Sequence, residues 1–290
     1  MGIAKATLDD LRREIDEIDD AIHDLLMRRT RVGETIGALK GNRDGPFLRP
    51  GREAEVLRRL VRRHQGSFPK PELVRIWREI MVSLVRLQGP FTVAVFTPDG
   101  STEYLDLARD HYGSHTPTSA CASASRVVRE VGEGAATVGV LPYPEEEETA
   151  PWWPLLLEAG KDRPRIIARL PFAGGGERSE ALAIAKLAPE ETGEDRSLLA
   201  FETEDEVSRT RLNSALTEAG LRPLFLAGCR STRNHKAWFH LVEVDGFVAP
   251  QDTRIGNFAA HLGEALGGIV TLGAYAAPLN AREIDGGKAT

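Results

Sequence analysis

Apolar residues recur at alternating intervals of four and three along the first forty positions of the chain. No proline interrupts this repeat, which runs through Leu11, Ile15, Ile18, Ile22, Leu25, Val32, Ile36 and Leu39. The spacing predicts one helix over residues 8–40, about 50 Å long at about 1.5 Å per residue, with Thr7 as its N-cap. The apolar stripe of so long a helix needs a covering surface, and the next fifty residues offer only two shorter helices. We therefore expect a second chain to pair with it.

The pattern changes twice further along the chain. After the Gly- and Pro-rich stretch 41–51, residues 52–64 and 71–88 show the periodicity of two shorter helices, and Gly89-Pro90 closes the unit. Short apolar runs such as 91–96 and 136–141 then alternate with helical stretches, which is typical of an α/β layer. A loop-rich passage is expected from 145 to 196.

The last third of the chain predicts a strand, a helix, two strands, a helix and a strand. This βαββαβ order is that of a ferredoxin-like module. The expected fold class is therefore multidomain, with an all-α unit over 1–90, an α/β lobe over 91–196, a ferredoxin-like module over 197–279 and a frayed polar tail over 280–290.

Composition excludes several classes of protein. The net charge of −6 combines a basic first segment with an acidic remainder, without the aromatic-studded basic stripe of a nucleic-acid surface. The cysteines, Cys121 and Cys229, form no CxxC pair, and the histidines show no ligand spacing, so neither a disulfide framework nor a metal site is expected. No apolar stretch is long enough for a signal core or a membrane span, which favours a cytoplasmic protein.

One position of the apolar stripe carries a charge. Arg29 stands between Leu25 and Val32, where the repeat predicts an aliphatic residue. A buried guanidinium is costly unless a partner neutralises it, so it needs a carboxylate such as Asp24 or Glu53, or an anionic ligand. On this residue alone both interpretations stay open.

Further polar residues fall near the same end of the helical unit. Lys40 lies three turns after the arginine of the stripe and projects from nearly the same face. Arg52 and Glu53 begin the second helix, whose dipole favours an anion there, and Gln88 can return from the end of the third helix. Arg12 lies about 25 Å before that arginine along the rod, so it can reach only the pocket of a paired chain.

These residues resemble a known family. The stretches LRREIDEIDDAIHDLLMRR and RPGREAEVL, with the lysine that ends the first helix, are similar to the all-helical chorismate mutases, in the version fused to prephenate dehydratase and an ACT domain. The resemblance implies an intertwined homodimer with six site residues, namely Arg12 contributed to the other subunit's site, Arg29 on a carboxylate, Lys40 on the ether oxygen, Arg52 and Glu53 at the second helix, and Gln88. The sequence departs from the family at Arg49, where the family has aspartate, and at Ser83 or Leu84, near its helix-three serine.

The implied reaction is the Claisen rearrangement of chorismate to prephenate, in the biosynthesis of phenylalanine and tyrosine. It is a concerted shift within one molecule, so no nucleophile, proton transfer, cofactor or metal is expected. The enzyme must hold the reactive conformer and place positive donors where charge develops at the ether oxygen. Arginines suit the two carboxylates because their planar forks bind bidentately.

The remainder resembles the other two parts of the fused family. TPDGSTEYLDLA and VGVLPYPEE are similar to dehydratase motifs, but Pro144 and Glu145 replace their key residues, so we expect a single-lobe remnant without dehydratase activity. The last module resembles an ACT domain, of whose effector motif it keeps Arg230, a candidate contact for an aromatic amino acid. Two alternatives stay open, a bifunctional mutase and dehydratase, and a non-catalytic sensor that binds a dianion.

Overall fold

The computed structural model describes residues 6–40, 47–148, 150–158, 163–174, 179–231, 237–263 and 266–285. The three predicted helices are confirmed as α1 (Leu8–Lys40), α2 (Pro50–Arg63) and α3 (Lys70–Gln88). The Thr7 hydroxyl caps α1, because its Oγ1 accepts a hydrogen bond from the Asp10 amide at 3.2 Å. No helix in these ranges is both long and apolar enough to cross a membrane.

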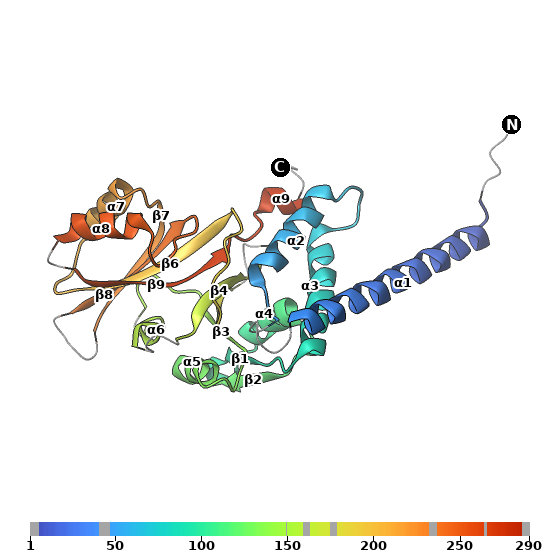
Figure 1. The fold of residues 1–290 in the computed structure, drawn as a ribbon, viewed down its shortest axis with the longest axis horizontal. Helices are drawn as coiled ribbons and strands as arrows, with labels where there is room; N and C mark the ends of the chain where they lie inside the picture. The colour runs from blue at the N-terminus through green and yellow to red at the C-terminus, as the bar shows by residue number, and fades with distance from the viewer. Residues whose placement is uncertain are drawn as a thin grey trace.

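Most of α1 stands clear of the rest of the chain as a rod (Figure 1). Only its last third approaches α3, where Gly33 faces Leu84 and Gly37 faces Gln88. The whole apolar stripe is exposed, from 46% at Leu11 to 82% at Leu39. The expected stripe therefore exists in the folded chain, and nothing within this chain covers it along the described rod.

Nine strands of the described ranges form one sheet in the order β2-β1-β3-β5-β4-β9-β6-β8-β7. The first three strands in this order run parallel, and β5 and β4 add to them antiparallel. The strands are β1 (Val93–Phe96), β2 (Thr118–Cys121), β3 (Val138–Pro142), β4 (Arg165–Leu170), β5 (Ala181–Ala185), β6 (Asp195–Thr203), β7 (Pro223–Arg230), β8 (Trp238–Asp245) and β9 (Leu266–Ala276). The accompanying helices are η2 (Pro98–Gly100), α4 (Glu103–Tyr112), α5 (Ala124–Gly132), α6 (Pro154–Glu158), α7 (Arg209–Glu218), α8 (Thr253–Leu262) and α9 (Ala281–Asp285).

The second half of the sheet follows the predicted βαββαβ order. Its strands lie as β9-β6-β8-β7, and α7 and α8 lie together on one face of them (Figure 1). Aliphatic and aromatic side chains from both layers fill the space between, with Phe201, Leu216 and Phe258 fully buried. The order of elements in this module thus agrees with the sequence pattern.

The passage expected to be loop-rich contains two strands, β4 and β5. They join the lobe to the module within one continuous sheet, because β4 pairs with β9 at Ile166 and Gly273. Gly273 has a φ of 158°, and a Cβ there would lie 2.1 Å from the Ile166 carbonyl oxygen. Only glycine permits this approach of the two backbones.

The helical unit packs directly on the α/β region. Ala54, Leu57 and Val61 of α2 share an apolar cluster with Phe172, Ala276, Leu279 and Ile284. Ile284 belongs to α9, so residues 281–285, expected to fray, instead form a helix that covers this cluster. The end of the expected tail, 286–290, lies outside the described residues.

Candidate active site

A buried ion pair links α2 and α3. Arg78 Nη1 donates to Glu53 Oε2 at 2.7 Å, with side-chain exposures of only 5% and 9%. Burial raises the pKa of the Glu53 carboxyl, while the charges of Arg78 and Arg29 oppose that change. Burial likewise lowers the pKa of the Arg78 guanidinium, against the charge of Glu53. The charge of each group thus offsets part of the desolvation cost of the other.

Arg29 brings α1 to the same place. Its side chain is half-buried, and its Nη1 atom is out of contact with solvent and has no hydrogen-bond partner. Burial lowers the pKa of Arg29, and the charge of Glu53 opposes this shift. A buried guanidinium donor without a partner is rare in folded chains, so this atom is available to a bound anion.

Gln88 lies at the end of α3 beside α1. Its Nε2 donates to the Leu84 carbonyl at 3.0 Å, and its side chain faces Gly37. A Cβ at Gly37 would lie 3.4 Å from the Gln88 Cγ, so only a larger side chain there would displace the glutamine. Lys40 is the last residue of α1, but its side chain lies outside the described residues.

The other two predicted residues of the helical unit are exposed in a single chain. Arg12 lies near the free end of α1, 67% exposed, and forms an ion pair with Asp9 at 3.3 Å. Arg52 is 65% exposed and forms an ion pair with Glu55 at 2.8 Å. The structure thus brings Arg29 near Glu53, places Gln88 beside Gly37 further along α1, and leaves Arg12 and Arg52 on the surface.

Sequence reasoning missed two residues of this region. Arg78 lies on the apolar face of α3, beside Val74, Met81 and Val82, so the signal that singled out Arg29 was present here as well. Glu190, from the segment between β5 and β6, forms an ion pair with Arg49 at the start of α2. No local pattern in the sequence marks a contact between positions so far apart.

Comparison with known proteins decides the family of the helical part. Residues 11–89 match the family model for chorismate mutase type II. These residues form a type II chorismate mutase domain. A bifunctional chorismate mutase/prephenate dehydratase of Pseudomonas aeruginosa is 33% identical over 145 residues, which are 48% of this chain and 40% of that relative. An intracellular chorismate mutase of Mycolicibacterium smegmatis is 44% identical over 54 residues, 19% of this chain and 52% of the relative.

The similarity continues past the mutase domain. The 145-residue match to the bifunctional relative is too long to lie within the helical unit, so it reaches into the α/β region. Among solved structures, the chain described as "GqqA- a novel type of quorum quenching acylases" has a TM-score of 0.50 at 16% identity, over 65% of this chain and 95% of that one. A prephenate dehydratase from Streptococcus mutans gives 0.48 at 12% identity, over 65% and 98%. At such identities the likeness concerns the fold alone.

In the α/β region, the residues before β5 contact the stretch that resembles the first dehydratase motif. The Ser179 hydroxyl bonds to Glu103 at the start of α4, in the turn that follows β1. Burial raises the pKa of Tyr104, and the charges of Glu103, Glu145 and Glu148 add to this shift. Acidic side chains from the start of α4 and from the segment after β3 therefore lie around Tyr104.

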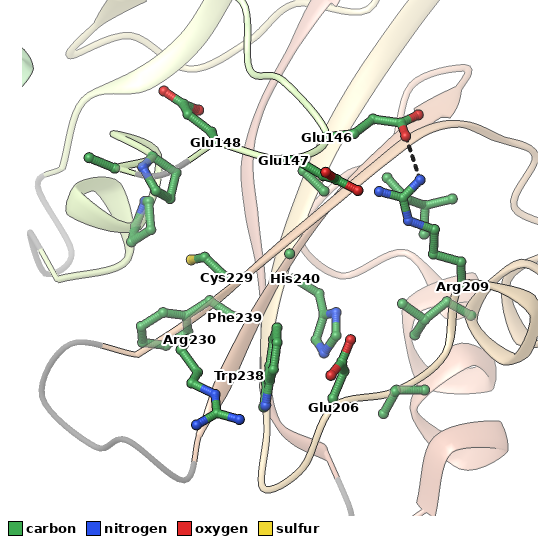
Figure 2. Close-up of a pocket in the computed structure, with 18 of the residues that line it drawn as sticks. Glu146, Glu147, Glu148, Glu206, Arg209, Cys229, Arg230, Trp238, Phe239 and His240 are labelled. Carbon is green, nitrogen blue, oxygen red and sulfur yellow. Dashed lines mark hydrogen bonds and ion pairs between the residues drawn. The ribbon is translucent and has the colours of Figure 1, made fainter.

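Arg230 lines a cavity of about 1070 Å³ between the ferredoxin-like module and residues 146–155 of the lobe (Figure 2). Its guanidinium carbon lies 5.4 Å from the centre of the Trp238 ring, and Arg209 forms an ion pair with Glu146 at the cavity wall. Burial raises the pKa of the Cys229 thiol to about 11 and lowers that of His240 to about 4, so both line the cavity uncharged at neutral pH.

Proposed function

We propose that this chain is a homodimeric chorismate mutase, which rearranges chorismate to prephenate. The observation that carries the proposal is the unpartnered, buried Nη1 atom of Arg29 next to the Glu53–Arg78 pair, inside the matched domain. A buried cationic donor beside a neutralised carboxylate suits a substrate that carries both carboxylates and a hydroxyl group.

Each side chain then has a role. Arg29 binds one carboxylate of chorismate, while Lys40 and Gln88 donate to the ether oxygen where negative charge develops. Glu53 accepts a hydrogen bond from the ring hydroxyl, and Arg52 adds positive charge at the start of α2. Arg78 holds the Glu53 carboxylate in place. The residues bind and orient a single reacting molecule, so the rate gain comes from conformation and charge.

The second copy of the chain supplies the remaining carboxylate contact. Arg12 and Arg29 lie about 25 Å apart on one rod, so a small ligand cannot touch both in one subunit. The exposed stripe of α1 supports pairing, because burial of its aliphatic side chains against a second α1 is favourable by about 1 kcal/mol for each half-exposed side chain. An intertwined dimer would bring Arg12 of one chain to Arg29 of the other.

The dehydratase-like lobe is proposed to lack activity. Glu103, Glu145 and Glu148 surround the position where its motifs meet. Prephenate is a dianion, so a pocket rich in carboxylates repels it. The bifunctional alternative predicts phenylpyruvate from prephenate, whereas we expect none from the purified chain.

The ferredoxin-like module is proposed to be an ACT-type regulatory or dimerising unit. Its cavity offers Trp238 for an aromatic ring, Arg230 for a carboxylate and Glu206 for an ammonium group, which suits an aromatic amino acid effector. Calorimetry with phenylalanine and tyrosine, on the wild-type chain and on Arg230→Ala, tests this assignment. Absence of binding to the wild type would leave dimerisation as the role of the module.

Turnover of chorismate tests the main proposal. We expect the wild-type chain to consume chorismate and to form prephenate, and Arg29→Ala to lose nearly all turnover while its helical circular dichroism is retained. Arg28→Ala, an exposed neighbour on the same helix, is the matched control and should stay active. Binding of chorismate without turnover by the wild type would favour the sensor alternative.

A mixed dimer tests the shared site. Arg12→Ala and Arg29→Ala chains are each expected to be inactive, but when they are unfolded and refolded together, half of the dimers contain one intact pocket. Activity should then recover to about a quarter of the wild-type value, the share of intact pockets in a symmetric dimer. Arg13→Ala in place of Arg12→Ala is the control. A mixture as inactive as its parents would contradict the exchange of Arg12.

A further inference from the structure

We propose that Glu190, from the α/β region, is a positioning residue of the mutase site that fixes the first turn of α2. The inference rests on the proposed mutase function and extends it, because it assigns a part of the site to a segment outside the matched domain. The contact joins residues 141 positions apart, from the start of α2 to the segment between β5 and β6.

The start of α2 has an unusual composition for a helix N-terminus. Arg49 is the N-cap residue and makes no side-chain capping hydrogen bond, and a positive charge at this end opposes the helix dipole. Position 49 is also where the sequence departs from the aspartate of the family. The Glu190 carboxylate forms an ion pair with Arg49, so it brings a negative charge to this turn.

Glu190 is in close contact with the backbone of the turn. A Cβ at Gly51 would lie 2.8 Å from the Glu190 Cβ and 3.1 Å from its Oε2, so no other residue fits at 51 without displacing Glu190. Arg52 and Glu53 follow Gly51 immediately. A shift of Glu190 would therefore move the turn that carries two of the proposed site residues.

The segment that bears Glu190 is itself held by α2. The buried Arg58 donates to Thr192 Oγ1 at 2.9 Å, to the Glu194 carbonyl at 2.6 Å and to the Ala277 carbonyl at 2.8 Å. Asp195 accepts from the Thr192 amide at 2.8 Å. Because these hydrogen bonds fix the segment along α2, the Arg49–Glu190 contact is more than a pairing of two free surface side chains.

The charge of Glu190 also reaches the buried carboxylate of the site. Burial is the largest cause that raises the pKa of Glu53, and the charge of Glu190 raises it further, against Arg78 and Arg29. The Tyr112 phenol of α4 also interacts with this cluster. Loss of the Glu190 charge therefore lowers the pKa of Glu53, a change that a purely mechanical contact would not produce.

Kinetics of full-length variants test the proposal. Glu190→Gln is expected to raise KM for chorismate about 2- to 5-fold with a smaller change in kcat, the size expected for one partly exposed charge contact. The acid limb of its kcat/KM profile should move to lower pH, because the ionised form of Glu53 persists further. Arg49→Gln loosens the same turn but keeps the carboxylate, so its KM rises without that shift. The exposed neighbour Glu191→Gln is the control and should match the wild type.

A second-site variant separates a positioning role from loss of structure. Arg49→Glu in the Glu190→Gln background returns a carboxylate to the same turn and should recover most of the lost affinity. Unchanged KM and pH profile in Glu190→Gln, with the wild type active, would overturn the proposal. Absence of mutase activity in the wild type would instead refute the function on which it rests.

Discussion

Replacement of Arg78 by methionine tests the buried ion pair most directly. The substitution keeps an unbranched side chain in the core but leaves the Glu53 carboxylate, 7% exposed, without its 2.7 Å donor. Loss of one partner of a buried pair costs about 3 to 5 kcal/mol. Since Arg29 still faces Glu53, we expect the lower end of that range, about 3 kcal/mol at pH 8.

The loss of unfolding free energy in Arg78→Met should be smaller at low pH than at high pH. Burial already raises the pKa of Glu53 above its unfolded value, and without Arg78 it rises further. A carboxyl whose pKa is raised by folding stabilises the folded state below the unfolded pKa, and this contribution is lost as the pH rises through the folded pKa. Arg78→Met should therefore be closer to the wild type at pH 5 than at pH 8.

Urea denaturation at pH 5 and pH 8, followed by helical circular dichroism at one protein concentration, measures both effects. Arg75→Met is the matched control on the same helix, because its ion pair with Asp110 is largely exposed and should change stability by less than about 1 kcal/mol. The double variant Glu53→Gln/Arg78→Met should regain most of the stability but none of the mutase activity. Equal loss at both pH values, or none at pH 8, would refute the reasoning.

Three further substitutions test the helical rod and the sheet. Ile18→Glu/Ile22→Glu places charges on the exposed stripe and should yield an inactive monomer by light scattering. Gly37→Leu should lower kcat about tenfold by displacing the glutamine that ends α3, whereas Gly37→Ala, whose Cβ meets it at an ordinary 3.4 Å, should not. Gly273→Ala should cost at least about 3 kcal/mol of unfolding free energy, because its Cβ meets a carbonyl oxygen at 2.1 Å, whereas Gly268→Ala on the same strand meets open space. If the Ile18→Glu/Ile22→Glu variant stayed dimeric, pairing through the stripe would be wrong. An unchanged kcat in Gly37→Leu would contradict the role of the glutamine, and unchanged stability in Gly273→Ala would contradict the close approach of the two backbones.

The helical part was predictable because its signal is local. The repeat through α1 and the Gly and Pro residues around α2 and α3 set the helix ends to within two residues of those observed. A charge within an apolar stripe also marked Arg29, and applied to the third helix the same rule marks Arg78. The spacing of apolar residues along an amphipathic helix is enough to identify its apolar face.

The missed features depend on contacts between distant segments. β4 and β5 are short, and the all-buried run at Ala181–Ala185 resembles any apolar stretch until neighbouring strands pair with both of its sides. α9 has few apolar residues, so its sequence alone does not predict a helix. Burial of Ile284 in the apolar cluster beneath it stabilises the helix in the folded chain. No local sequence pattern predicts the Arg49–Glu190 ion pair, because the two residues become neighbours only in the folded chain.

The position of α2 joins the mutase domain to the rest of the chain through shared contacts. One side of the helix carries Glu53 to the ion pair with α3, and other positions place Arg58 against carbonyls of the α/β region. Leu57, fully buried, belongs to the cluster that these two parts share. Isolation of residues 1–90 would expose that cluster and leave Arg58 without its acceptors, so the excised helices should be less stable than the same helices in the full chain.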